Sequence, residues 1–348
     1  GQERVRIVAA VSVAEGAWRL VASLSAVALG GGLTGVAVAF LIGRCMAWGL
    51  YRLWAGLPAP DGPGRSQARR PTAAQWRALW RQVPVYLGIV AVAALGARLD
   101  VLALSRLVGL DEVARYAVAA RLYEAALMLP TLAALVVLPP LSRQFNVDRA
   151  AFVANVPRVV GGILLWGLPI VIVGAGAMPW LIRLVFPPAL ADAAPMARVL
   201  LPAALLAALD MILASWMQAA RAQNADLRSL SWALLAMVVT LLVLVPRIGA
   251  LGAAIAMLVQ MVVRVVSRAA WARQTLRVQG LGPLLAGIAL AASIAMAVLL
   301  ACERWQPMLA IPAALIAYGV AIVCLGLSHP AQWRTALRGM PSPWTRTP

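Results

Sequence analysis

Long apolar runs follow one another along most of the chain and are separated by short polar segments. An α-helix rises about 1.5 Å per residue, so about 20 apolar residues cross the hydrocarbon core of a bilayer. On this basis the pattern predicts an all-α fold, a polytopic transmembrane helical bundle of about ten spans. The predicted spans are residues 7–29, 33–54, 84–106, 113–140, 157–177, 195–220, 228–246, 250–270, 282–302 and 308–327.

The composition agrees with a chain that is solvated by lipid. Of the 348 residues, 63% are hydrophobic and 12% are charged, and the mean hydropathy is +0.87. Soluble domains carry about 25% charged residues. A formal charge of +18 would favour nucleic acid in a soluble chain, but here the basic residues lie in short segments between the apolar runs. We therefore expect membrane lipids, and no nucleic acid, as partners.

The basic segments also predict an orientation, because Arg and Lys are retained on the cytoplasmic side of a membrane. Alternate loops are rich in arginine, and this asymmetry places both ends of the chain in the cytoplasm. The arginines expected on the cytoplasmic side include Arg65, Arg69, Arg70, Arg77, Arg81, Arg143, Arg149, Arg158, Arg221, Arg228, Arg268, Arg273 and Arg277. The opposite side carries Asp111, Glu112, Arg183 and Arg247.

Segment 55–82 interrupts the apolar pattern between the second and third spans. It begins with the turn-rich LPAPDGPGRSQARRP and continues with TAAQWRALWRQV, in which apolar and basic residues recur at helical spacing. The pattern indicates a cytoplasmic connector that ends either in an amphipathic helix at headgroup level or in an ordinary charged loop.

Ionisable residues within the predicted spans are the strongest functional signal. An ionisable side chain at mid-bilayer costs about 2.5–3.5 kcal/mol, so each one needs a partner, a water-filled cavity or a role. In stretch 96–144 the candidates embedded in the two apolar runs are Arg98, Asp100, Arg121 and Glu124. Arg121 and Glu124 are three residues apart and share a helix face, whereas Arg98 and Asp100 point in different directions.

Other charges in the spans have simpler interpretations. Glu15 and Arg19 have the i, i+4 spacing of a helical ion pair. Arg44 and Arg264 are close enough to the cytoplasmic interface to extend toward it. Asp210 stands alone in its run and is the candidate for a coupling-ion or proton site, with a hydrogen bond to a neighbouring helix as the alternative.

The sequence gives no reason to expect a metal, a cofactor or a disulfide framework. Such sites need clustered ligands. The three cysteines, Cys45, Cys302 and Cys324, are far apart in the chain, and the single histidine is His329.

Four segments together resemble a known family. They are RLDVLALSRLVGLDEVARYAVAARLYE at 98–124, LPPLSR at 138–143, WLIRLVFPPALADAAPMARVLLP at 180–202, and LVPRIGALGAAIAMLV at 244–259, a Pro-x-x-Gly-x-x-Gly-Ala-Ala hairpin. In order and spacing they are similar to the polysaccharide-biosynthesis (O-antigen, lipid-linked oligosaccharide) flippases of the multidrug/oligosaccharidyl-lipid/polysaccharide exporter superfamily.

The resemblance implies a two-lobed flippase whose first lobe is incomplete. Family members look like fourteen-span proteins made of two six-helix lobes and an extra helix pair. This chain would then supply the last two helices of the first lobe at 1–54, the connector at 55–82, the second lobe at 83–277, the extra pair at 278–328 and a cytoplasmic tail at 329–348. With the ten spans matched in this way, roughly four N-terminal helices are expected to be missing, and the start at Gly1 rather than Met agrees with this expectation.

The resemblance also implies a function. The expected activity is the flipping of undecaprenyl-pyrophosphate-linked oligosaccharide across the bacterial inner membrane by alternating access, with no enzymatic step. Arg121 and Glu124 would face the cavity, and Arg98, Asp100 and Arg44 are further cavity candidates. Expected partners are the lipid-linked glycan and export components such as a polysaccharide polymerase.

Several alternatives remain open at this stage. Arg121 and Glu124 could neutralise each other, or a neighbouring helix, in a dry bundle. The chain could instead be a drug or small-cation exporter of the same superfamily, although its spans hold more Arg than acidic residues. A membrane glycosyltransferase or polymerase would need polar catalytic residues in a sizeable external loop, and the predicted external loops are short. An inactive fragment is the last alternative.

Overall fold

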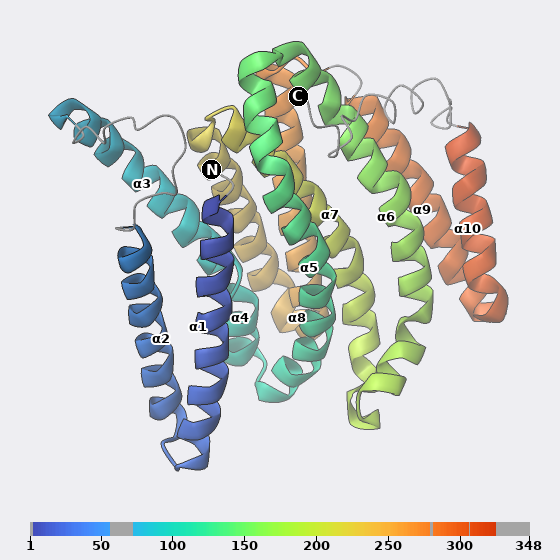
Figure 1. The fold of residues 1–348 in the computed structure, drawn as a ribbon. Helices are drawn as coiled ribbons and strands as arrows, with labels where there is room; N and C mark the ends of the chain where they lie inside the picture. The colour runs from blue at the N-terminus through green and yellow to red at the C-terminus, as the bar shows by residue number, and fades with distance from the viewer. Residues whose placement is uncertain (1–2, 56–71, 279–280, 306, 325–348) are drawn as a thin grey trace. The chain divides into compact units, whose positions relative to one another are not determined.

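The computed structural model of the chain describes residues 3–55, 72–278, 281–305 and 307–324 (Figure 1). These residues form helices and contain no strand, which confirms the all-α prediction. Most of the predicted connector and the whole predicted tail lie outside them. The helices are α1 (Glu3–Ala28), α2 (Gly32–Ala55), α3 (Ala73–Gly96), α4 (Leu99–Leu107), α5 (Leu110–Val147), α6 (Arg149–Val185), the short 3₁₀ helix η1 (Pro188–Ala193), α7 (Ala194–Ala219), α8 (Gln223–Thr275), α9 (Leu281–Trp305) and α10 (Pro307–Cys324).

Every predicted span overlaps one of these helices, but the number of spans that stand out is smaller than ten. Among the described residues, five helices are long and apolar enough to cross a membrane, or six if α3 and α4 are counted as one bent span. One reason is that α8 counts once, although its 53 residues hold the two predicted spans 228–246 and 250–270. The predicted span 84–106 is broken at residues 97–98, where α3 and α4 meet at 40°.

The chain divides into two compact units, Gly1–Ala74 and Gln75–Pro348. The first unit is a hairpin of α1 and α2. Gly30 and Gly32 in its turn have positive φ angles of 76° and 51°, a conformation that costs glycine little. The indole Nε1 of Trp18 donates to the carbonyl of Ala39 at 3.2 Å and ties the two helices together.

The second unit is organised around α7, which packs against α5, α6 and α8. Buried residues occur on all sides of α7. In its most apolar stretch 61% of the residues are buried, whereas in the corresponding stretch of α9 the share is 22%. A helix that is apolar all round belongs in the interior of a bundle. One buried cluster joins α7 to α6, α9 and α10, and a second joins it to α4, α5 and the middle of α8, on both sides of its turn.

Helix α8 is a helical hairpin rather than one straight rod. Its backbone leaves the helical conformation at Ile248 and Gly249, and Gly249 has a φ of +57°. Gly252 follows so closely that a Cβ there would lie 2.7 Å from the carbonyl carbon of Leu244. The hairpin predicted at 244–259 is therefore confirmed, with glycine at the two positions that need it.

The turn of α8 is held by the start of α5. The Oε2 atom of Glu112 accepts a hydrogen bond from the backbone N–H of Ala250 at 2.8 Å. Glu112 Oε1 also lies 3.0 Å from Nη1 of Arg115. A carboxylate at the first free N–H groups of a helix satisfies a donor that has no partner within the helix. The acidic loop and the α8 turn, both predicted on the external side, thus meet in the fold.

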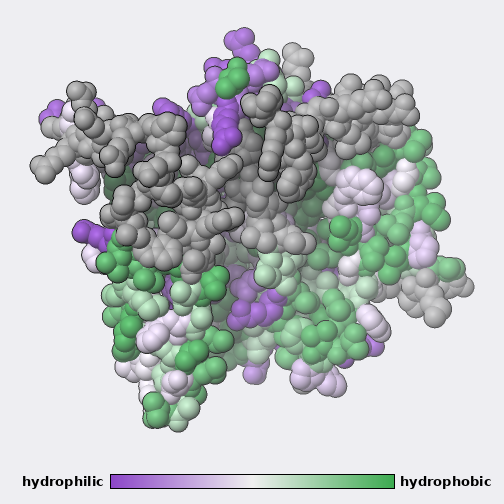
Figure 2. All heavy atoms as spheres, in the orientation of Figure 1, coloured by the Kyte–Doolittle hydropathy of each residue, from purple (hydrophilic) through white to green (hydrophobic). Residues whose placement is uncertain are grey.

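Much of the outer surface of the second unit is apolar. In Figure 2, hydrophobic side chains cover much of the side where α6, α9 and α10 lie, and hydrophilic side chains gather at one end, above α5 and α6. The exposed side chains of α6 include Trp166, Ile170, Trp180 and Leu184. Those of α8 include Trp232, Leu235, Val239 and Leu242. Such surfaces suit contact with acyl chains.

Candidate functional site

The outward face of α5 differs from those of α6 and α8. Its exposed positions recur every three or four residues and carry small or polar side chains, apart from one methionine. We call this surface the α5 face, and it consists of Ala114, Ala117, Arg121, Glu124, Met128 and Thr131. Nη1 of Arg121 donates to Oε2 of Glu124 at 2.7 Å, and 76% and 53% of the two side chains are exposed.

The Arg121–Glu124 pair lies near the middle of the bundle's length. Oγ1 of Thr131 approaches Sδ of Met211 in α7 at 3.6 Å. Arg121 and Glu124 precede Thr131 by ten and seven residues in α5, which runs parallel to α7. The same offset from Met211 along α7 leads to Leu201, so the pair lies at the level of Leu201. The Leu201 side chain packs against Gly174 of α6. Gly174 in turn lies inside residues 159–182, a stretch of α6 without ionisable side chains. The pair is therefore at the depth of hydrocarbon.

An exposed ion pair at this depth is costly if it faces lipid, even though the two charges cancel, because both groups lose water. The small side chains around it also leave a surface that acyl chains would fill poorly. By contrast, the exposed positions of α6 at similar depth hold large apolar groups such as Ile170. The α5 face is therefore better suited to water or a polar ligand than to lipid.

The other two candidate charges of stretch 96–144 are Arg98 and Asp100. Arg98 lies in the break between α3 and α4, and Asp100 lies in the first turn of α4. Arg98 is exposed and precedes the first turn of α4. Asp100 is only 5% exposed. Its Oδ2 accepts from the hydroxyl of Tyr116 in α5 at 2.6 Å, and its Oδ1 accepts from the N–H of Val101 at 2.8 Å. Asp100 thus joins α4 to α5, and the two side chains do diverge, as their spacing predicts.

Arg44 belongs to the first unit and is paired there. Its Nη1 lies 3.2 Å from Oε1 of Glu15. The same carboxylate pairs with Arg19, which confirms the predicted i, i+4 ion pair. The guanidinium of Arg19 also lies over the ring of Phe40, 5.2 Å from its centroid. One carboxylate in α1 therefore holds arginines from both helices of the unit.

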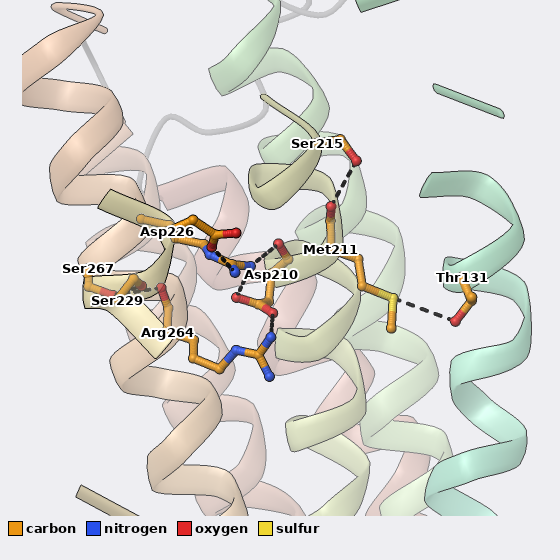
Figure 3. Close-up of polar contacts among 9 residues, drawn as sticks. Thr131, Asp210, Met211, Ser215, Asp226, Ser229, Arg264 and Ser267 are labelled. Carbon is orange, nitrogen blue, oxygen red and sulfur yellow. Dashed lines mark hydrogen bonds and ion pairs between the residues drawn. The ribbon is translucent and has the colours of Figure 1, made fainter. Parts of the chain in front are cut away.

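The second polar centre is a buried network of four charged side chains (Figure 3). Nη2 of Arg264 lies 2.7 Å from Oδ2 of Asp210. Arg268 is 2% exposed, and its Nη1 donates to Oδ1 and to the backbone carbonyl of Asp210 at 2.5 and 2.8 Å. Its Nη2 donates to Oδ1 of Asp226 at 2.5 Å. We call these four residues the ionic network. It joins α7 to both arms of the α8 hairpin.

The composition of the network explains how it tolerates burial. It contains two carboxylates and two guanidiniums, so its formal charges cancel, and each guanidinium has a carboxylate within 2.7 Å. Beside it, the hydroxyls of Ser229 and Ser267 are hydrogen-bonded to each other across the two arms. A buried charge that keeps all its partners is tolerated, whereas losing one partner leaves an uncompensated ion.

The network places Arg268 and Arg264 differently from the sequence-based expectation, and it adds Asp226 to the candidate residues. Arg268 was expected in a cytoplasmic segment, but it is buried within α8, because two carboxylates replace water around it. Arg264 turns inward to Asp210 rather than toward an interface. Asp226 was not singled out by the sequence. The available signal was Gln260, Arg264 and Arg268 at intervals of four residues, which puts them on one helix face.

Asp210 as a coupling-ion site remains a prediction with an added condition. Its two carboxylate oxygens already contact the guanidiniums of Arg264 and Arg268. An ion or proton at Asp210 would have to compete with at least one of these contacts. In the described part of the chain, no group of three or more His, Cys, Asp and Glu residues is arranged to hold a metal ion.

Comparison with known proteins gives a likeness of fold. No protein-family model matches the chain, and no curated protein matches it. Among solved structures, it is similar to a lipid II flippase MurJ in an inward closed conformation, with a TM-score of 0.59 and 11% sequence identity. The match covers 89% of this chain and 65% of that one, so the chain spans less than two thirds of that protein's length. The chain therefore has a multi-helix membrane fold of the MurJ flippase type.

Proposed function

We propose that this chain is part of a flippase that moves an undecaprenyl-pyrophosphate-linked oligosaccharide across the bacterial inner membrane for polysaccharide or O-antigen export. It breaks no bond and works by alternating access. Both ends of the chain face the cytoplasm. The glycan's polymerase and other export components are its functional partners. The family resemblance in the sequence and the likeness of fold to a lipid II flippase support the proposal.

The observation that carries the proposal is the α5 face. It presents an exposed Arg121–Glu124 pair at mid-bilayer depth, among small side chains, on a unit whose other outer faces are apolar. A lipid-linked sugar combines an anionic pyrophosphate and a polar glycan, both of which need a wet, polar path through the hydrocarbon. The α5 face provides one wall of such a path.

The chemistry of the pair fits this cargo. A guanidinium stays charged and offers a planar fork of N–H donors, which matches the oxygens of a pyrophosphate. In the resting state Glu124 neutralises Arg121 at 2.7 Å, and an arriving pyrophosphate competes with that carboxylate. The membrane potential assists outward movement, because one negative charge leaving an inside-negative cell gains about 2.3 kcal/mol per 100 mV. Arg98 provides a further exposed cation at the α3–α4 break.

Thiol labelling tests whether the α5 face is wet. With Cys45, Cys302 and Cys324 replaced by serine, single cysteines are introduced at Ala117 and Met128 on the α5 face and at Ile170 on α6. A membrane-impermeant methanethiosulfonate is then applied to membranes that contain the full chain. We expect the two α5 cysteines to react at least about tenfold faster than the α6 control, because water reaches only the former. Equal and slow labelling at all three positions would refute a wet α5 face.

A protection experiment then separates the proposed cargo from the drug-exporter alternative. Undecaprenyl pyrophosphate is expected to slow labelling at Ala117→Cys and Met128→Cys, and a lipophilic cationic dye is expected to have no effect. The opposite result, protection by the dye alone, would contradict the flippase proposal and favour a small-cation exporter.

A further inference from the structure

A shallow pocket lies at the end of the second unit where α6 begins and α8 ends. Its volume is about 610 Å³, and it is lined by Arg149, Ala150, Val153, Ala154, Pro157, Arg277 and Val278. Five of these residues come from the first turns of α6, and two, Arg277 and Val278, follow the end of α8. The pocket therefore has an apolar floor and two arginines, and it is separate from both the α5 face and the ionic network.

The pocket lies at the level of the lipid headgroups. Helix α6 has no ionisable residue between Arg158 and Arg183. Those 24 residues rise about 36 Å, slightly more than the hydrocarbon thickness of about 30 Å. Residues 149–157 precede this stretch and so lie just outside the hydrocarbon. The pocket is on the side that the distribution of arginine assigns to the cytoplasm.

The backbone holds Arg277 at the pocket. Its φ of +55° is uncommon for a residue with a side chain. Its neighbours, Leu276 and Val278, are both buried, at 7% and 4% exposure. The N–H of Val278 donates to the carbonyl of Ala272 at 3.4 Å. Two buried anchors therefore fix the chain on either side of one exposed arginine.

The charge at the pocket is not compensated. Within the described residues, neither Arg149 nor Arg277 forms an ion pair. Arg149 instead lies over the ring of Phe145, 5.6 Å from its centroid. The nearest acidic residue in the sequence, Asp148, is engaged as the cap of α6, where its Oδ1 accepts from the N–H of Ala151 at 2.9 Å.

We infer that this pocket binds the headgroup of an anionic phospholipid from the cytoplasmic leaflet. Arg149 and Arg277 hold the phosphodiester, and the alanine, valine and proline floor receives the glycerol backbone and the first methylenes of the acyl chains. Basic pockets between membrane helices on the cytoplasmic side suit anionic lipid headgroups for this reason. The inference does not depend on the proposed cargo or on the α5 face.

The test uses the full chain in nanodiscs of phosphatidylcholine, into which phosphatidylglycerol is titrated while thermal unfolding is followed. Phosphatidylglycerol is expected to raise the unfolding temperature of the wild-type chain. The double variant Arg149→Gln/Arg277→Gln is expected to need at least about tenfold more phosphatidylglycerol for the same shift. The control Arg183→Gln/Arg247→Gln removes the same charge from exposed arginines of the opposite predicted side and should respond like the wild type.

Three outcomes would overturn the inference. The first is the same titration for the wild type and for Arg149→Gln/Arg277→Gln. The second is an equal loss in the control variant, because the response would then report net charge alone. The third is full stabilisation by inorganic phosphate in phosphatidylcholine nanodiscs, which would assign the pocket to a soluble anion.

Discussion

Charged residues in this chain have different roles, according to whether side chains from other helices form ion pairs or hydrogen bonds with them. Asp100 and Asp210 are buried and engaged by Tyr116 and by two arginines, so they hold helices together. Arg121 and Glu124 are matched only by each other and are exposed. An exposed pair adds little to stability, typically between 0 and about 1 kcal/mol. A charged pair that contributes so little to the fold, yet lies at hydrocarbon depth, is consistent with the proposed contact with the cargo.

Replacing Arg121 with alanine should therefore separate transport from stability. We expect Arg121→Ala to lower the transport of undecaprenyl-pyrophosphate-linked glycan by at least about tenfold, equivalent to about 1.4 kcal/mol. The midpoint of thermal unfolding should barely change. Transport is measured by the appearance of glycan on the periplasmic side of cells, and unfolding is measured on the purified chain. Arg121→Lys, which keeps the charge but loses the fork, should lie between the two.

Full transport by Arg121→Ala would show that the pair is a surface ion pair without a role in the cavity. A large loss of stability together with transport would show instead that the pair is structural.

At this scale the sequence predicts local partners well and distant partners poorly. The Glu15–Arg19 pair follows from i, i+4 spacing, and it is present. The partners of Asp210 are 54 and 58 residues away in α8, and no periodicity within one helix links them. Arg268 was assigned to a loop because an unpaired arginine would belong there. Its two carboxylate partners become apparent only once α7 and both arms of α8 are in place.

Among the elements, the α8 hairpin takes part in several polar cross-links between the described residues of the second unit. Glu112 holds its turn, and the ionic network holds its open end to α7. The turn follows from the Pro-x-x-Gly-x-x-Gly pattern, because the backbone requires glycine at 249 and 252. The α3–α4 break has no such signal. Neither proline nor a glycine pair stands at residues 97–98, and apolar residues resume after Arg98 and Asp100, so the predicted span runs on to residue 106.

Removing the central cation of the ionic network should destabilise the second unit strongly. Arg268→Met keeps much of the side-chain volume but leaves Asp226 without its guanidinium in a buried site. The expected loss is about 3–5 kcal/mol, the usual effect of breaking a buried ion pair from one side. Reversible denaturation of the purified chain in mixed micelles measures it. Arg273→Met, at an exposed position on the same arm, is the matched control and should change stability by less than about 0.5 kcal/mol.

The close approach in the hairpin gives a second test at this scale. A Cβ at position 252 would meet the backbone of Leu244 at 2.7 Å, whereas a Cβ at Gly162 of α6 would meet nothing within 4 Å. Gly252→Ala should therefore cost about 1–3 kcal/mol through overpacking. Gly162→Ala should be neutral or should stabilise the helix by up to about 1 kcal/mol. The same denaturation assay compares them, and equal effects would mean that the arms of the hairpin are further apart than described.

For the whole molecule, the fold follows from the apolar runs, but the number of spans does not. Each predicted run overlaps a helix, yet only five or six elements among the described residues are apolar enough to be assigned as membrane spans from hydropathy alone. Helix α8 combines two of the predicted runs, and the break between α3 and α4 divides another.

The orientation predicted from arginine can be tested on α8 alone. In the chain without its native cysteines, Arg247→Cys at the hairpin turn should react with an impermeant thiol reagent added to intact cells. Gln274→Cys near the end of the second arm should react only after the cells are opened. The reverse pattern would invert the orientation and would move the anionic-lipid pocket to the periplasmic leaflet.

The ionic network also has a consequence for biogenesis. The second arm of α8 carries Arg264 and Arg268 and no acidic residue. Entering lipid alone, it would bear the cost of two unpaired arginines, each of which costs up to about 2.5–3.5 kcal/mol at mid-bilayer. Both carboxylates that neutralise them, Asp210 and Asp226, are synthesised earlier. We therefore expect the translocon to retain α7 and the first arm until the second arm arrives, so that the three helices enter the bilayer together.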